Sequence, residues 1–426
     1  MAINDFLGTA TAVAQVDTFT PANVEADDIF TLTVTGFDGT SETFSYTAVD
    51  TSATTVSGAI IALWNAKTES LYTGITASGT DTVILTADTA GTAFKVASTT
   101  TDGGGADTQT FARVATTKNE GPNDWSSTTN WSLGTVPGED AGGDNSEDVY
   151  VRDSAIDILY GLDGSGATSY LKSLHVDMTY TGKIGHDEDA GYAGDYLQVE
   201  TALLYIGEDA CNTRIAGSSR IKIDVGSTQK CVTTVYNTSS SNDTGKPAFR
   251  LKANNSDHEI RDIRKGTVGI CCLTSESGEV ASIFQSYDTN IASDSTLTVG
   301  EGLTVETIES IGGIINIHQL STKTITTLTN SGGAMKTFGA GVVTTFDGDG
   351  GTITPSSTGT ITTYIAGGGL TDFTKSAESR TVTNLQYKAG ARLKIDVLTG
   401  GSGVVTVTNG ITPYTDGRKQ LTISDA

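Results

Sequence analysis

The architecture follows from five related segments: Val305-Glu-Thr-Ile308, Ile325-Thr-Thr-Leu328, Val343-Thr-Thr-Phe346, Ile361-Thr-Thr-Tyr364 and Val382-Thr-Asn-Leu385. The copies begin 20, 18, 18 and 21 residues apart, and an apolar residue stands at both ends of each. A residue pair lies seven and eight positions after each start, and nine of these ten residues are glycine: Gly312-Gly313, Gly332-Gly333, Gly350-Gly351, Gly368-Gly369 and Ala389-Gly390. This periodicity is typical of a repeat protein.

A unit of about 20 residues with short β runs, glycine corners and no helix between copies fits one coil of a parallel β-helix. Stacked coils lie about 4.8 Å apart. We therefore expect the first apolar residues to form one interior column, the fourth residues to form a second, and the threonines between them to form outward ladders. We also expect the corner glycines to adopt positive φ, so that Gly332→Val or Gly351→Val would disrupt a corner.

The composition supports a mainly β protein. The chain of 426 residues contains 50 Gly and 6 Pro, and charged residues make up only 18%. This mixture favours many short strands joined by glycine turns. We predict a β-solenoid over residues 148–400, with its clearest coils between 305 and 391, and a C-terminal strand or cap segment over 401–426.

Residues 1–117 are predicted to form a small N-terminal α+β domain that acts as an adaptor. Apolar and polar residues alternate over 28–36 and 42–49, which predicts a hairpin. A helix follows, and then come three or four strands. Their strand-like runs are 72–78, 81–87, 92–98 and 107–114.

The helix of this domain is expected to begin after Thr51 or Ser52, because either side chain can cap a helix N-terminus. Five apolar residues have helical spacing: Val56, Ala59, Ile60, Leu63 and Trp64. That spacing places them on one face. We expect Trp64 to pack the helix on a sheet rather than to bind a ligand.

Residues 118–147 are predicted to be a linker and a cap. Charge, Gly and Pro are mixed without periodicity over 115–124, so a boundary lies near 118. Trp125 and Trp131 follow, and they need an apolar surface. An open solenoid end exposes unpaired backbone and core side chains. We therefore interpret 125–147 as the N-terminal cap of the solenoid.

The net charge of −24 repels phosphates and anionic lipids. We expect neither a nucleic-acid nor a membrane partner; the acidic surface keeps the protein soluble, and binding of a cation or a basic partner is the alternative. The first residues contain an acid but no Lys or Arg, and no signal segment follows. No run approaches the ~18 apolar residues that span a bilayer. The sequence predicts synthesis in the cytoplasm.

Four cysteines are present: Cys211, Cys231, Cys271 and Cys272. None has the C-x-x-C spacing of a zinc site or a redox dithiol. Adjacent residues of a strand point to opposite faces, so a disulfide between Cys271 and Cys272 would be strained. We expect free, buried thiols and a reducing site of synthesis.

A search for catalytic residues gives weak candidates. β-Helices that cut polysaccharides place two or more carboxylates along one groove. The candidates are Asp224 and the cluster Asp257-His258-Glu259 with Arg261 and Arg264. All lie in ordinary strand or loop contexts. No nucleophile elbow, phosphate loop or Cys/His pair accompanies them. We assign no catalytic and no cofactor-binding residue, and expect a protein that is not an enzyme.

A search for metal ligands also gives only weak candidates. The histidines are His175, His186, His258 and His318, and none has a second His or Cys at ligand spacing. Asp347-Gly-Asp349-Gly350 resembles the front half of a calcium loop, but position 358 is Thr where such loops end in Glu. His186-Asp-Glu-Asp189 and the loop 138–148 are also acidic. We assign no metal ligand, and calcium binding by these loops stays open.

Several segments carry a family resemblance: Val16-Asp-Thr-Phe19, Asp28-Ile-Phe-Thr-Leu32, Thr82-Val-Ile-Leu-Thr-Ala-Asp-Thr-Ala-Gly91, Thr100-Thr-Asp-Gly-Gly-Gly105 and Asn130-Trp-Ser-Leu-Gly-Thr-Val-Pro137. With these joined to the repeat, the chain resembles structural proteins of tailed-bacteriophage virions over most of its length. The resemblance concerns domain arrangement and turn motifs. It implies a particle component made in the host cytoplasm, and it transfers no active-site residue.

We therefore expect a capsid decoration or stabilising (cement) protein whose partners are the major capsid protein or other virion proteins, and which forms a homo-oligomer, a trimer. A receptor-binding tail fibre or spike is the first alternative, and it would bind a host glycan; the aromatic content of 7% counts mildly against it. A bacterial surface adhesin would require an export route. A polysaccharide-degrading β-helix would lose turnover on changing a groove carboxylate.

Overall fold

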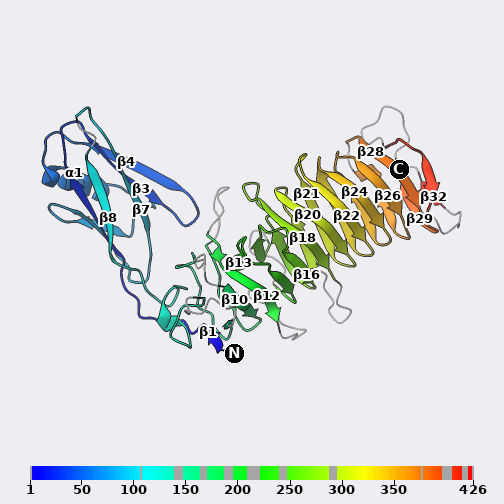
Figure 1. The fold of residues 1–426 in the computed structure, drawn as a ribbon, viewed down its shortest axis with the longest axis horizontal. Helices are drawn as coiled ribbons and strands as arrows, with labels where there is room; N and C mark the ends of the chain where they lie inside the picture. Colours follow the sequence, from blue (N-terminus) through cyan, green and yellow to red (C-terminus); the bar gives the residue numbers. More distant parts are fainter. Residues whose placement is uncertain are drawn as a thin grey trace.

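The computed structural model describes residues 2–105, 108–138, 147–163, 170–186, 195–208, 221–238, 247–286, 295–375, 378–395, 405–414 and 421–424. The molecule is elongated (Figure 1). A small domain that contains the helix α1 (Ala53–Asn65) lies at one end, beside the first coils of a long stack of strands. The protein is mainly β, as the composition predicts.

Two parallel sheets form the stack, and from β10 to β30 strands that follow one another along the chain alternate between them, so each coil in this part supplies one strand to each sheet. Sheet 1 contains, in spatial order, β1 (Ala2–Asp5), β9 (Glu147–Val151), β10 (Tyr170–Asp177), β12 (Glu200–Glu208), β14 (Val232–Val235), β16 (Glu259–Ile263), β18 (Gly278–Gln285), β20 (Leu303–Ser310), β22 (Thr324–Asn330), β24 (Val342–Gly348), β26 (Ile361–Ala366), β28 (Arg380–Tyr387) and β30 (Val405–Val407), with β31 (Ile411–Pro413) also on β28.

Sheet 2 contains β11 (Leu197–Gln198), β13 (Ile221–Asp224), β15 (Phe249–Lys252), β17 (Gly266–Ile270), β19 (Ser295–Val299), β21 (Ile314–Gln319), β23 (Ala334–Gly339), β25 (Thr352–Pro355), β27 (Leu370–Asp372), β29 (Ala391–Lys394) and β32 (Leu421–Ser424). Two short 3-10 helices are η1 (Thr128–Asn130) and η2 (Phe373–Lys375). The solenoid thus extends over residues 147–299, where the repeat is weak, and the last strands continue both sheets.

The strand register confirms the predicted interior columns. In sheet 1 the fourth residues of the repeat face one another in the order Ile308, Leu328, Phe346, Tyr364 and Leu385. All five are fully buried, and so are the first residues of the repeat. Thr307, Thr327, Thr345 and Thr363 are aligned on the outer face, as expected. Each buried aliphatic or aromatic side chain contributes about 1.5–3 kcal/mol to folding.

The glycine at the second position of the pair adopts positive φ in four of the five corners, and Gly369 is the exception. Gly333 has φ of 68° and Gly351 has φ of 69°. The expectation for Gly332 is wrong, because its φ is not in the left-handed region; its constraint is steric, since a Cβ there would lie 2.3 Å from the carbonyl oxygen of Ile311. At Gly332 and Gly351 the corners of adjacent coils stack so closely that a side chain has no space.

The small domain consists of two antiparallel sheets and α1. Its strands are β2 (Val16–Ala22), β3 (Ile29–Thr35), β4 (Ser41–Thr47), β5 (Ile75–Ser78), β6 (Val83–Ala87), β7 (Lys95–Thr101) and β8 (Thr110–Thr117). One sheet has the order β5-β6-β2-β8 and the other β4-β3-β7. The predicted hairpin is β3–β4, and the four later runs correspond to β5–β8. The strand β2 is an addition to the predicted order.

The helix α1 begins after Ser52, whose hydroxyl accepts the backbone N–H of Thr55 at 3.2 Å. Trp64 is buried, as expected, and its indole N–H donates to the carbonyl oxygen of Ile75 at 2.9 Å. Leu63 was placed on the buried face, but its side chain is 41% exposed. The fully buried residues of the helix are Val56, Ser57, Ile60 and Trp64, so the buried stripe does not extend to Leu63.

The small domain is an insertion in the solenoid rather than a separate N-terminal unit. The strand β1 pairs in parallel with β9, so residues 2–5 belong to sheet 1, whereas the sequence places all of 1–117 in the small domain. The chain then enters the small domain, and the segment by which it returns to the solenoid lies beside the segment by which it left. The N–H of Val13 in the first segment donates to the carbonyl oxygen of Glu120 in the second at 2.9 Å. The two bodies have separate hydrophobic cores.

Two tryptophans close the N-terminal end of the solenoid core. Trp125 and Trp131 are buried and meet edge to face at 4.6 Å, and the indole N–H of Trp131 donates to the carbonyl oxygen of Trp125. Phe6, which follows β1, packs on Trp131 at 5.3 Å. All three belong to the same buried cluster as the coil interior. This segment therefore covers the first coil with apolar side chains.

Candidate functional surfaces

The small domain contacts the solenoid through the turn between β3 and β4. The ring of Phe37 in this turn stacks on His186 at 4.3 Å and meets Tyr160 edge to face at 5.3 Å. Lys95, at the start of β7, lies 4.7 Å from the Phe37 ring and forms an ion pair with Asp195. We call these five residues the latch.

Backbone hydrogen bonds continue the latch. The N–H of Asp195 donates to the carbonyl oxygen of Phe37 at 3.0 Å, and the N–H of His186 donates to the carbonyl oxygen of Asp195 at 3.1 Å. Burial lowers the pKa of His186, which is therefore neutral in the latched arrangement at neutral pH. A cavity of about 320 Å3 lies beside the latch, lined by Phe37, Lys95, Leu159, Gly161, Leu162, Asp163, Asp195, Tyr196 and Gln198.

The strength of the latch follows from its contacts. Aromatic pairs contribute about 0.5–1.5 kcal/mol each. The Lys95 and Asp195 side chains are 43% and 32% exposed, so their ion pair contributes only about 0.2–1 kcal/mol. The latch is thus worth a few kcal/mol, far less than either hydrophobic core.

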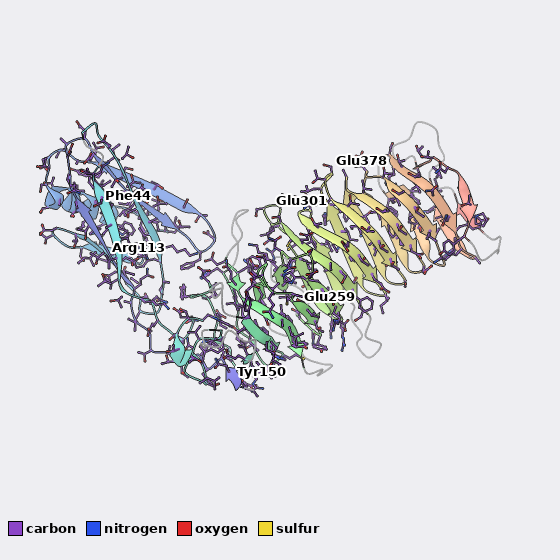
Figure 2. The ribbon with its side chains drawn as sticks, viewed as in Figure 1. Phe44, Arg113, Tyr150, Glu259, Glu301 and Glu378 are labelled. Atoms are coloured by element: carbon purple, nitrogen blue, oxygen red, sulfur yellow. The ribbon has the colours of Figure 1, made fainter. Side chains whose placement is uncertain are left out.

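A row of aromatic side chains runs along the outer face of sheet 1. Tyr150 on β9 stacks on His175 on β10 at 4.3 Å, and His175 stacks on Tyr205 on β12 at 4.7 Å. Tyr236, directly after β14, follows Tyr205 at 6.3 Å. We call these four residues the aromatic ladder. It begins at the N-terminal end of the solenoid, where Figure 2 shows Tyr150.

Arginine side chains cover both ends of the aromatic ladder. The guanidinium of Arg152 lies 4.5 Å from the Tyr150 ring and pairs with Asp5 on β1 at 2.7 Å, a contact that raises the pKa of Arg152. Arg264 lies 4.6 Å from the Tyr236 ring and pairs with Asp262. The faces of these rings are therefore occupied by one another or by a cation.

The candidate residues Asp224 and His258 lie close together and hold one turn. Gly226, whose φ is 71°, donates its N–H to the Asp224 carboxylate at 3.1 Å, and its carbonyl oxygen accepts from Nε2 of His258 at 3.2 Å. Nδ1 of His258 accepts the N–H of Cys231. Burial raises the pKa of Asp224 and lowers that of His258. Both side chains are therefore engaged in hydrogen bonds with backbone groups.

The remaining residues of that candidate cluster are on the outer face. Asp257 is exposed, and Glu259 pairs with Lys230 at 2.5 Å and with Arg261 at 3.1 Å. Hydrogen bonds from these two cations lower the pKa of Glu259. Arg264 pairs with Asp262 and lies over the last ring of the aromatic ladder. The charged residues of the cluster therefore form ion pairs at both ends of β16. Figure 2 places Glu259 midway along the solenoid.

The acidic pair Asp347 and Asp349 is neutralised by a lysine. Nζ of Lys388 lies 3.0 Å from Asp347 and also pairs with Asp349. Burial raises the pKa of Asp347 despite this partner. Among the described residues, no three His, Cys, Asp or Glu side chains are gathered so that they could hold a metal ion. Residues 139–146 and 187–190 of the other acidic loops lie outside the described residues.

The cysteines and the remaining histidine differ in how deeply they are buried. Cys231 and Cys271 are buried free thiols, and burial raises the pKa of each to about 12. Cys272 is half-buried, and Cys211 lies outside the described residues. His318 stacks on Phe338 at 4.7 Å on the outer face of sheet 2, and burial lowers its pKa. His318 is therefore part of a packed surface.

Sequence reasoning missed a group of buried charged side chains on the outer face of sheet 2. Lys222 is fully buried, and its Nζ donates to the carbonyl oxygen of His186 at 2.7 Å. The ammonium groups of Lys222 and Lys252 each lie 4.7 Å from the Tyr196 ring. The Tyr196 hydroxyl donates to Glu276 at 2.5 Å, and burial raises its pKa. No periodic signal links residues so far apart in sequence.

Comparisons with known proteins return no match: neither a family model, nor a curated protein, nor a solved structure is similar to this chain. Within the described residues, no helix has the length and apolar character needed to cross a membrane.

Proposed function

We propose that this chain is a structural component of a virus particle of the tailed-phage kind, a capsid decoration or cement protein. The observation that carries the proposal is the union of a rigid solenoid with one separately folded small domain at its capped end. A small domain with its own core can bind a neighbouring shell subunit, while the solenoid projects from the shell or clasps it.

The chemistry of the candidate residues supports a structural role. Among the described candidates, Asp224 accepts a backbone N–H, Asp347 and Asp349 pair with Lys388, and Glu259 pairs with two cations. The net charge of −24 keeps such a protein soluble at high copy number and disfavours contact with nucleic acid. We propose the major capsid protein as the partner, a trimer as the oligomeric state and the virion as the location.

Cryo-electron microscopy of particles that contain this chain tests the proposal. Many ordered copies on the icosahedral shell, in contact through the small domain, are the expected result. Copies confined to the tail would contradict decoration and favour the second candidate below. Particles that assemble fully without the chain in their map would contradict both.

The second candidate is a receptor-binding tail fibre or spike, and the aromatic ladder favours it. Four aromatic side chains on one outer face are a surface that could bind a host glycan through ring edges and tyrosine hydroxyls. A glycan-binding screen of the purified protein tests this, with Tyr236→Ala as the variant and Phe338→Ala on sheet 2 as the control. Binding that both variants retain would contradict a role for the ladder.

A further inference from the structure

The connection between the small domain and the solenoid has two distinct parts. Two chain segments cross between the bodies side by side, joined by the hydrogen bond from Val13 to Glu120. The latch is a separate contact, made by the turn that carries Phe37. Because each body has its own core, neither needs the latch in order to fold.

The chemistry of the latch is that of a reversible contact. Domain interfaces that hold permanently are large and apolar, whereas small polar ones permit relative motion. Among the described residues, the bodies are joined by the Phe37 ring, by the partly exposed Lys95–Asp195 ion pair and by one backbone hydrogen bond. A side-chain hydrogen bond between Thr92 and Tyr160 adds to this small polar contact. The cavity beside them shows that the two surfaces do not interdigitate along the whole contact.

We propose that the small domain is a hinged arm that swings about the two crossing segments and is held closed by the latch. The closed arm has the Phe37 ring between Lys95 and His186. Opening breaks the Asp195 hydrogen bond and the ion pair while both cores stay intact. An adaptor of this kind adjusts its angle to the solenoid when it binds a partner.

The latch is also expected to respond to acid. The groups that face His186 are Lys95, Asp195, Lys222 and Tyr160, and burial is the main cause of its lowered pKa. An open arm exposes His186 and restores an ordinary pKa near ~6.5, so protons bind the open state more strongly. The closed state is therefore favoured above that pH and is weakened as the pH falls below it.

Small-angle X-ray scattering and hydrogen exchange on the full chain test the hinged arm. Phe37 lies outside both cores, so Phe37→Ala should leave the fold intact, increase the radius of gyration and speed exchange of the Asp195 amide about tenfold. Peptides from β20–β24 should exchange as in the wild type. Val49→Ala is the matched control, because Val49 is 72% exposed beyond the other end of the same hairpin.

A charge exchange separates the latch from general destabilisation. Lys95→Asp alone and Asp195→Lys alone should each open the arm, and the double variant should close it again. The proposal is overturned if Phe37→Ala and both single charge variants have the scattering curve and Asp195 exchange rate of the wild type. Lowering the pH from about 7.5 to about 5.5 should open the wild type and leave His186→Gln unchanged.

Discussion

The late and the early coils of the solenoid share two sheets but differ in how their surfaces are used. Between β20 and β28 the repeat is regular, with glycine corners, aligned interior columns and threonine outside. Between β9 and β16 the outer faces carry the aromatic ladder, ion pairs and the contact with the small domain. The regular late coils thus bury aligned side chains, whereas the less regular early coils carry the side chains that contact the small domain and form the aromatic ladder.

The largest expected loss of stability comes from a variant that interrupts an interior column in the late coils. Phe346→Ala removes a fully buried ring between Leu328 and Tyr364 and should lower the free energy of unfolding by about 3–5 kcal/mol. Urea unfolding followed by circular dichroism measures it. Thr345→Ala, on the outer face of the same strand, should change it by less than about 0.5 kcal/mol. Equal effects of the two would contradict the column.

The next largest effect is expected from alanine substitutions at two corner glycines. Gly351→Ala places a Cβ 2.2 Å from the carbonyl oxygen of Gly333 at a φ of 69°, whereas Gly390→Ala meets nothing within 4 Å at a φ of 81°. Left-handed strain alone costs about 1–2 kcal/mol, so only Gly351→Ala should cost clearly more. Urea midpoints measured in parallel decide this. Similar midpoints would mean that the corner can shift to accept a methyl group.

The early coils should depend on the aromatic ladder. Tyr205→Ala removes two ring contacts at once and should cost about 1–3 kcal/mol. Tyr205→Phe keeps the stack and should change stability by less than about 0.5 kcal/mol. Hydrogen exchange of β10 and β12 measures the effect locally. Unchanged exchange in the alanine variant would show that the ladder adds nothing to stability.

The smallest expected effect is a pH dependence of stability that arises mainly from His258 in the early coils. His258 is neutral when folded because burial lowers its pKa, whereas the unfolded chain protonates it near the ordinary value of about 6.5. Stability from His258 is present above that pH and is lost as the pH falls below it. His258→Gln should therefore lose less thermal stability between about pH 7.5 and about pH 5.5 than the wild type. His318→Gln, at a more exposed site, should keep most of the dependence.

Local patterns carried the predictions that succeeded. The spacing of Ile308, Leu328 and Phe346 indicated which residues align, because coils of similar length place equivalent positions above one another. The helix start at Ser52 and the buried Trp64 follow from capping and helical spacing in the same way. Leu63 shows the limit, since a face that is apolar in sequence can be wider than the surface it packs against.

The sequence by itself determined that this protein is mainly β, that its C-terminal part is a stack of coils and which side chains fill the late coils, because these properties depend on periods of about 2 and 20 residues that the chain displays directly. Only the tertiary structure decided that β1 pairs with β9, that Phe37 meets His186 and that four aromatic rings form one ladder. Those contacts join residues far apart along the chain, and a strand as short as β1 has no periodic pattern to reveal its partner.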